Sequence, residues 1–359
     1  MKVALWMPRA SEIPGGHVIQ MQRTAAALRL LGVEVVETTD PELPDEELDL
    51  VHGFGMGVHA RHVESGRRRG LPVVISPVYV GIRYDSRGPE ERIGARQALG
   101  RLSRAVRIGA AGLRGREPLI RRALAETDRE LDRIRAWSAA DMLLVNAGGE
   151  RDELIADLGV QTDTRVVPNA VDPGSFAPVP GVERVRRSAL FVGRIEPHKN
   201  QLGLIKALAG TDISLSIVGP PHPHHDEYVR ACRAAASGRQ VEFVGSVPHD
   251  QLAAHYSAAA VHVLPTWFET TGLVSLEAAL CGCAVVSTSR GHAREYLQDD
   301  AWFCDPADPA SVRRAVLDAV NAGPSPALAT RIHQHYTWAD TATETLAAYK
   351  DVLARRSAR

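Results

Sequence analysis

Two glutamates, Glu269 and Glu277, lie eight residues apart where a loop is predicted to turn into a helix. Glu269 falls in the loop, and Glu277 falls about one turn inside an amphipathic segment, residues 273–281. Gly282 occupies the position at which a helix commonly ends. At a rise of about 1.5 Å per helical residue, the two carboxylates are expected roughly 10 Å apart. They would flank a helix N-terminus, whose free N–H groups attract anions.

This spacing suits a ligand in which a sugar, a diphosphate and a ribose are laid end to end. The spacing is equally consistent with a simpler arrangement, in which Glu269 complements the helix dipole and Glu277 is solvated. The choice between the two depends on which other charged groups the fold brings to the same helix end.

Two cations, Arg194 and Lys199, follow a predicted strand and the glycine Gly193. Arginine binds a diphosphate in fork geometry, and lysine adds a compact charge, so this pair at a strand end suits a diphosphate. A surface loop that carries two ordinary cations is the alternative.

Paired glycines, Gly15 and Gly16, follow the first predicted strand. Such glycines let the backbone approach a ligand closely and present its N–H groups, although a plain turn uses them as well. A second run, Gly53–Gly57, lacks the G-x-G-x-x-G spacing because residue 58 is valine. We therefore do not expect a nicotinamide site.

A run of histidines, Pro221–His225, is the strongest metal-like signal in the chain. Local spacing fixes no carboxylate partner for it, so we interpret the run as incidental and predict no metal. No Asp-x-Asp pair follows a predicted strand, which argues against a metal-held nucleotide sugar. The cysteines also lack zinc spacing; they are Cys232, Cys281, Cys283 and Cys304.

The length of 359 residues predicts two domains. Apolar residues make up 45% and charged residues 24%, as in ordinary globular proteins, and the net charge of −1 does not favour nucleic acid as a partner. The first residues do not read as a signal peptide, and no stretch approaches about 18 unbroken apolar residues. These features predict a cytoplasmic protein.

Short apolar strands alternate with helical segments in both halves, which is typical of βαβ units in doubly wound parallel sheets. In such sheets ligands bind beyond the carboxyl ends of the strands. A proline- and glycine-rich stretch after Pro168–Asp172 separates the halves. The predicted strands are residues 3–7, 33–36, 48–52, 72–76, 142–145 and 165–167, then 189–192, 213–218, 241–244, 261–264 and 284–287.

An arginine-rich helical segment lies between Arg92 and Arg122, with nine arginines against one acid, Glu117. A basic amphipathic helix can contact an anionic membrane surface or an anionic acceptor, although such a helix is often only a solvated face.

Taken together, these motifs resemble those of the family 4 retaining glycosyltransferases. The resemblance rests on Phe191–Arg194 with Lys199, on Glu269 and Glu277, and on residues 282–286. It implies the GT-B fold, in which two Rossmann-like doubly wound parallel-sheet domains face each other across a cleft. The domains implied here are residues 1–172 and 188–336, with a linker at 173–187 and a C-terminal helix, 337–359, returning to the first domain.

The resemblance also implies a role for each matching residue. Arg194 and Lys199 would bind the diphosphate of a nucleoside diphosphate sugar, Glu269 the hydroxyls of the donor sugar, and Glu277 the ribose. Family members need no metal, and the leaving diphosphate helps to deprotonate the acceptor, so catalysis is electrostatic. The remaining donor-binding positions implied are Gly15, Gly16, Gly193, Gly245, Val247, Thr270, Thr271, Gly272 and Leu273.

The chain departs from the family pattern in two places. Many members carry a histidine at the end of the strand that matches residues 72–76, where this chain reads Ser76–Tyr79. Tyr79 or Tyr84 could occupy nearby space. The usual Asn-Gly of the interdomain segment is Asn169-Ala170.

The leading prediction is therefore a metal-independent retaining enzyme that transfers a hexose-type sugar to a saccharide, lipid-linked or small-molecule acceptor. A glycosyltransferase-like subunit that binds nucleotide with little catalysis is an alternative. An epimerase or phosphorylase of the same fold is another.

Overall fold

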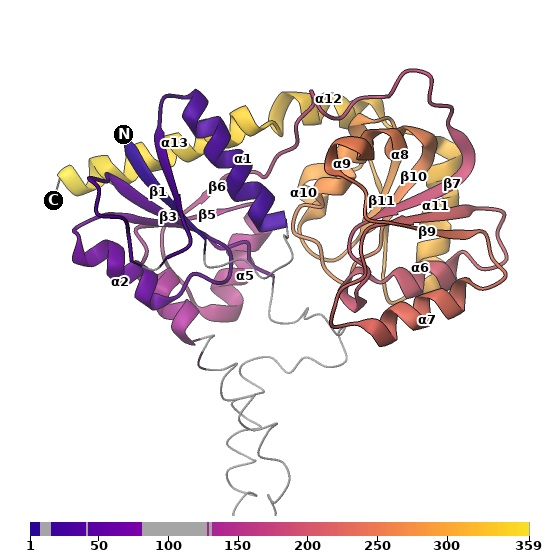
Figure 1. Cartoon of the computed structure of the whole chain (residues 1–359), viewed down its shortest axis with the longest axis horizontal. Coiled ribbons are helices and arrows are strands. Elements are labelled where there is room, and N and C mark those ends of the chain that lie inside the picture. Colours follow the sequence, from indigo (N-terminus) through magenta and orange to yellow (C-terminus); the bar gives the residue numbers. More distant parts are fainter. Residues whose placement is uncertain (8–15, 41, 81–127, 129–130, 359) are drawn as a thin grey trace, which may run out of the picture. The chain divides into compact units, whose positions relative to one another are not determined.

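Two compact units make up the chain in this computed structural model, which describes residues 1–7, 16–40, 42–80, 128 and 131–358 (Figure 1). The described residues up to Val167 and those from Ala342 onward form the first unit, and Pro168–Thr341 form the second. Each unit is built on one six-stranded sheet, and the strand pairings within both sheets are parallel.

The sheet of the first unit has the order β2-β1-β3-β4-β5-β6. Its central strands are buried along their whole length, because helices cover both faces of a parallel sheet. The outer strands β2 and β6 are partly exposed. The strands are β1 (Lys2–Trp6), β2 (Glu34–Thr38), β3 (Leu50–Phe54), β4 (Val73–Ser76), β5 (Met142–Val145) and β6 (Thr164–Val166).

Helices α2 and α5 cover one face of this sheet, and α1 and α13 lie on the opposite face (Figure 1). On the α2 and α5 face the core is built from aliphatic residues around Trp137. The helices are α1 (Gly16–Leu30), α2 (Ala60–Arg68), α5 (Gly148–Leu158) and α13 (Trp338–Ser357).

The C-terminal helix α13 is joined to the first unit by polar contacts. The hydroxyl of Tyr349 lies 2.7 Å from Nδ1 of His52 on β3, and Arg165 on β6 forms an ion pair of 2.8 Å with Asp351. Because Ala342 onward belongs to the first unit, the last helix connects the end of the chain to its beginning.

The sheet of the second unit has the order β12-β11-β10-β7-β8-β9, the doubly wound arrangement in which strand order reverses beside the first strand, β7. This reversal places the carboxyl ends of β7, β8 and β10 side by side. The strands are β7 (Val185–Val192), β8 (Ser214–Val218), β9 (Val241–Gly245), β10 (Ala259–Leu264), β11 (Ala284–Thr288) and β12 (Trp302–Cys304).

Helices α6, α7 and α11 pack on one face of the second sheet, around Phe191 and Ile217, while α8 and α9 lie on the other face (Figure 1). The helices are α6 (Gln201–Ala207), α7 (Asp226–Ala236), α8 (Leu252–Ala258), α9 (Leu273–Leu280), α10 (Ala293–Leu297), α11 (Pro309–Ala322) and α12 (Pro326–His335), with short 3₁₀ turns at Pro197–Lys199 and His249–Gln251.

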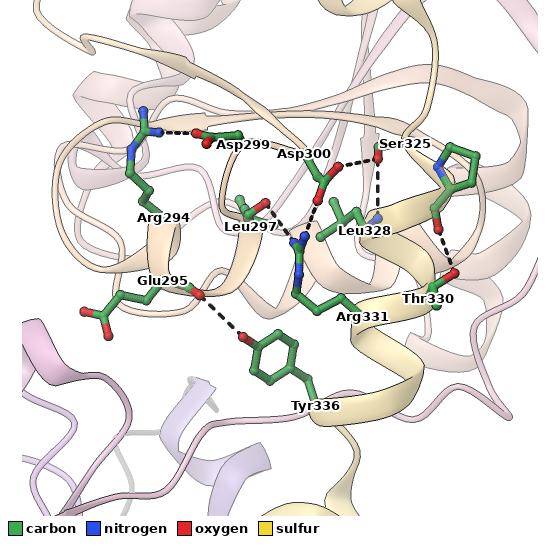
Figure 2. A network of polar contacts seen from close by, with 11 residues as sticks. Arg294, Glu295, Leu297, Asp299, Asp300, Ser325, Leu328, Thr330, Arg331 and Tyr336 are labelled. Atoms are coloured by element: carbon green, nitrogen blue, oxygen red, sulfur yellow. Dashed lines mark hydrogen bonds and ion pairs between the residues drawn. The ribbon is translucent and has the colours of Figure 1, made fainter.

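A polar network fixes α12 to the loop after α10 (Figure 2). Asp300 accepts a hydrogen bond of 2.8 Å from Ser325 and pairs with Arg331, and these two partners lower the pKa of its carboxyl group. Arg331 also donates to the carbonyl of Leu297 at 3.2 Å. The end of α12, where the chain turns toward α13, is therefore held to the second unit.

The division of the chain falls between Val167 and Pro168, whereas the sequence placed it after residue 172. The segment expected to be a linker, residues 173–187, belongs to the second unit. Phe176 is buried against the rings of His249 and Tyr256, and β7 begins at Val185. The prolines and glycines of this segment are typical of a linker, and they outweighed its one buried aromatic residue in the sequence pattern.

None of the helices in the described part of the chain is both long enough and apolar enough to span a membrane. The arginine-rich segment between Arg92 and Arg122, Gly15 and Tyr84 lie outside the described residues.

Candidate active site

The loop that leaves β7 carries both predicted cations. Its backbone is held by β8 and its exit loop, since the Gly193 amide donates to the carbonyl of Val218 at 2.9 Å and that of Ile195 to Pro220 at 2.9 Å. The Gln201 side chain donates to the Arg194 carbonyl at 2.6 Å. The 3₁₀ turn that follows presents Lys199. Both cations are therefore placed by backbone contacts at the carboxyl end of β7.

The loop that leaves β10 brings Glu269 to the same place. Its Oε2 lies 3.3 Å from Nζ of Lys199 and 3.5 Å from the Thr266 hydroxyl. Lys199 and Glu269 are seventy residues apart in sequence, and they meet because β10 pairs with β7. Only 24% of the lysine side chain and 12% of the glutamate side chain are exposed, so solvent screens this pair less than it would a surface pair.

The backbone of Glu269 is fixed to the loop after β11. Its amide donates to the carbonyl of Arg290 at 3.2 Å, and its carbonyl accepts from the amide of His292 at 2.8 Å. A Cβ on Gly291 would lie 2.3 Å from the Glu269 carbonyl oxygen, so this close approach requires glycine. The orientation of Glu269 thus depends on three strand ends.

Helix α9 begins next to Glu269, as the sequence predicted. Gly272 caps it in the left-handed conformation, with φ 74° and ψ 57°. Thr271, just before the cap, is buried, and its hydroxyl has no hydrogen-bond partner within the described residues. A buried hydroxyl and a helix N-terminus are groups that can donate to an anion. Thr270, Thr271, Gly272 and Leu273 all lie at this helix end.

Glu277 lies within α9 and forms a second polar cluster with His249 and Tyr256. Its Oε1 is 2.9 Å from Nε2 of His249, and its Oε2 accepts a hydrogen bond of 2.9 Å from Tyr256. Burial, followed by the nearby Glu277 carboxylate, raises the pKa of Tyr256 well above its usual value. Glu277 is buried, while 40% of the His249 side chain is exposed, so His249 is the accessible end of this cluster.

The two glutamates therefore serve different clusters. Glu269 is paired with a cation, and Glu277 is held by an imidazole and a phenol. Gly245 and Val247 lie at and just beyond the end of β9. The carbonyl of Gly245 accepts from the amide of Gly219 at 2.7 Å, which ties this loop to the exit of β8.

In the first unit, fewer of the predicted site residues lie in polar clusters than in the second unit. Gly16 is exposed at the start of α1. Tyr79, which could lie near the place of the strand-end histidine, has its ring buried against Trp137, and its hydroxyl donates to Asp157 at 3.1 Å. Val78, just before it, has a φ of 48°, a strained value for a β-branched residue.

The strand end in the first unit is organised by a buried acid. Glu150 accepts the backbone amides of Tyr79 and Asn146, both at 2.6 Å, and the Asn146 amide oxygen accepts from Gln20 at 2.8 Å. The exits of β4 and β5 are thereby joined to α5 and α1. Sequence reasoning did not identify this contact, since the three segments are far apart in the chain.

Sequence reasoning missed several site residues in the second unit, among them Glu196, Thr266, His249 and Tyr256. Glu196 pairs with Arg194 at 3.4 Å and lies 3.9 Å from Nε2 of His222. Glu196 lies two positions after the strand-end Arg194, and His249 lies two positions after Val247, so their polar side chains beside predicted site residues are signals that could have indicated them.

Comparison with known proteins agrees with this arrangement. Residues 181–333 match the family described as Glycosyl transferases group 1. A sucrose-phosphate synthase structure from Thermosynechococcus elongatus superposes with a TM-score of 0.72 at 19% identity, covering 99% of both chains. Anabaena HepE in complex with UDP gives a TM-score of 0.72 at 16% identity, covering 98% of this chain and 100% of that one. The fold is GT-B. The residues that match the glycosyltransferase family all lie in the second unit.

Two curated relatives match about two thirds of the chain. A D-inositol 3-phosphate glycosyltransferase from Kineococcus radiotolerans is 30% identical over 66% of this chain and 64% of its own length. One of the same name from Geodermatophilus obscurus is 32% identical over 63% of this chain and 57% of its own length. The chain thus spans less than two thirds of the length of these relatives.

Proposed function

We propose that the chain is a retaining, metal-independent glycosyltransferase of family 4 that uses a nucleoside diphosphate sugar. The supporting observation is the Lys199–Glu269 pair beside the start of α9, with Arg194 on the same loop as Lys199 and Glu277 in a separate cluster one turn further on. Acceptors of the saccharide, lipid-linked and small-molecule classes are all compatible with it.

The donor diphosphate carries the charge that Arg194 and Lys199 would stabilise. Each cation is now paired with a carboxylate, at 3.4 Å to Glu196 and 3.3 Å to Glu269. A diphosphate at the α9 N-terminus would draw both cations toward itself and leave the Glu269 carboxylate to accept hydrogen bonds from sugar hydroxyls. Glu277 and His249 would then hold the ribose.

The reaction breaks the bond between the anomeric carbon and the diphosphate oxygen and forms a bond from that carbon to an acceptor oxygen. The diphosphate leaves with the bonding electron pair, and the acceptor proton passes to a phosphate oxygen. The protein contributes electrostatic stabilisation of the leaving group through Arg194, Lys199 and the helix end. No side-chain base is needed on this route.

The relatives suggest which donors and acceptors to test first. HepE has been crystallised with UDP and with UDP-glucose, and the curated relatives are named for D-inositol 3-phosphate. We therefore favour a uridine nucleotide as donor carrier and include a phosphorylated cyclitol among the acceptors to be tested.

A thermal-shift screen with UDP, GDP and UDP-glucose, in the presence of a chelator, tests donor binding. A ligand at about a hundred times its Kd should stabilise the protein by about 2.7 kcal/mol. Lys199→Ala should abolish most of that shift, whereas Lys206→Ala, which removes an exposed lysine on α6, should retain it. Absence of any nucleotide-dependent shift would rule out the proposal.

Substitution of the two glutamates separates their roles. Glu269→Ala should lower turnover by roughly a hundredfold, since it disturbs the placement of the reacting sugar, and should leave UDP affinity nearly unchanged. Glu277→Gln should instead weaken UDP itself. Isothermal titration with UDP and a radiolabelled transfer assay measure the two effects. Equal losses of binding and turnover in Glu269→Ala would contradict the sugar-contact role. Tight UDP binding without transfer or hydrolysis would favour a nucleotide-binding subunit.

A further inference from the structure

Glu196, His222 and His225 form a cluster that the proposed sugar transfer does not use. One carboxylate oxygen and one ring nitrogen from each histidine all lie within 4.8 Å of one another. The carboxylate comes from the loop after β7 and the histidines from the loop after β8. The sequence offered the histidines without a carboxylate, and the pairing of β7 with β8 supplies it.

Backbone contacts place the three side chains independently of any ligand. Ile195, adjacent to Glu196, forms an isolated parallel bridge with Pro221, and its carbonyl accepts from the His222 amide at 3.2 Å. The His225 amide donates to the His222 carbonyl at 3.1 Å, and His225 caps helix α7. A preorganised set of this kind loses little conformational entropy when it binds an ion.

The geometry is close to that of a metal site. Nε2 of His222 lies 3.9 Å from Oε2 of Glu196, too far for a direct hydrogen bond. Two ligand atoms on a tetrahedral ion, with bonds of about 2.0–2.2 Å, are roughly 3.4 Å apart. The rings of His222 and His225 are 4.6 Å apart between centroids. A shift of about half an ångström would therefore bring the carboxylate and the imidazole to coordination distance.

We propose that Glu196, His222 and His225 bind a divalent transition metal ion of the zinc type. Two imidazoles and one carboxylate suit zinc, cobalt or nickel, whereas magnesium and calcium prefer oxygen ligands alone. Three protein ligands leave a fourth position for water. Neither Lys199 nor Glu269 belongs to this site, and its link to the proposed donor site is the Arg194–Glu196 contact.

Binding of the ion would compete with Arg194 for Glu196. Nη2 of Arg194 lies 3.4 Å from Oε1 of Glu196, so a cation on the other carboxylate oxygen is repelled by the guanidinium. One internal contact also has to yield: Nδ1 of His222 accepts from the His224 amide at 3.2 Å, which leaves the proton of the neutral ring on Nε2. Coordination through Nε2 requires the neutral ring to carry its proton on Nδ1 instead, so Nδ1 can no longer accept from the His224 amide.

Isothermal titration of chelator-treated full-length protein with zinc chloride tests the proposal. We expect one ion per chain, and an affinity at least about tenfold weaker in His222→Ala, His225→Ala and Glu196→Gln. His224→Ala is the matched control, because His224 is an exposed histidine of the same loop that does not belong to the cluster. Its affinity should equal that of the unsubstituted chain. Absence of saturable binding, or an equal loss in His224→Ala, would overturn the assignment.

Two further measurements identify the ligand set. The cobalt-loaded protein should show tetrahedral d–d absorption without thiolate charge-transfer bands, and such bands would assign the ion to the buried cysteines instead. Arg194→Ala should bind zinc several-fold more tightly, since it removes the competing cation, while Lys199→Ala should not, because Lys199 pairs with Glu269. Weaker binding in Arg194→Ala would contradict the competition for Glu196.

Discussion

Two buried histidines lie on matching strands of the two sheets, and they differ in the hydrogen bonds that they make. His52 lies on β3, beside the first strand β1, and His262 lies on β10, beside the first strand β7. Both are almost fully buried, and burial lowers the pKa of each to about 3. Both are therefore neutral imidazoles in the folded protein.

Their hydrogen bonds differ. His52 uses both ring nitrogens, at 2.7 Å to the Tyr349 hydroxyl and 2.9 Å to that of Ser76. His262 makes one long contact, 3.4 Å from its Nδ1 to the Ser275 hydroxyl, and its Nε2 has no hydrogen-bond partner in the part of the chain that the structure describes.

The difference shows what each histidine does for its neighbouring helix. His52 fixes α13, which comes from the far end of the sequence, to the first sheet. His262 lies under α9, whose polar contacts run instead from Glu277 to His249 and Tyr256. In the first unit the buried imidazole of His52 fixes α13 to the sheet. In the second unit the polar contacts around α9 belong to the candidate site.

His52→Leu should have the largest effect. It leaves the buried hydroxyls of Tyr349 and Ser76 without their shared partner, and each such group costs about 1–3 kcal/mol. The free energy of unfolding at pH 8 should fall by roughly 2–6 kcal/mol, as measured by urea denaturation. His333→Ala, at an exposed position on α12, is the control and should change it by less than about 0.5 kcal/mol. A His52→Leu effect as small as that of the control would show that the two hydrogen bonds do not hold α13.

The two histidines should make similar contributions to the dependence of stability on pH. Below pH 6.5 the unfolded histidines take up protons, while the folded ones resist until about pH 3. Stability is thus present above pH 6.5 and is lost as the pH falls toward 3, at up to about 1.4 kcal/mol per pH unit for each group.

Replacing either histidine with leucine should reduce that slope by the same amount, even though the two variants differ at pH 8. Urea denaturation between pH 8 and pH 5 gives both quantities. Unequal changes in slope would mean that burial alone does not set the two pKa values.

The strands were predicted well where their sequence is apolar, and less well at their ends. β10 and β11 lie where expected, but β7 begins at Val185 instead of residue 189, because its first three residues are exposed and two of them are arginines. β12, Trp302–Cys304, was missed, since three residues at a sheet edge show no pattern.

For the site, the residue types were predictable and their partners were not. Gly193, Arg194, Lys199, Glu269 and Glu277 could be selected as residues that follow strands or begin a helix. That Lys199 meets Glu269, and that Glu196 meets His222, depends on β7 lying between β10 and β8. Strand order follows from packing across the whole unit, which local spacing does not encode. The partners of Glu277 depend likewise on α8 packing against α9.

His262→Leu should have the smallest effect on stability. The sign of the change in unfolding free energy should distinguish it most clearly from His52→Leu. The substitution removes a buried ring nitrogen that lacks a partner among the described residues, and it keeps an apolar side chain of similar volume against Tyr256. Only the 3.4 Å contact to Ser275 is lost. The free energy of unfolding at pH 8 should therefore change by less than about 1 kcal/mol, or rise. A loss as large as that of His52→Leu would mean that His262 supports α9 as strongly as His52 supports α13. In that case UDP affinity, measured on the same variant, should fall as well.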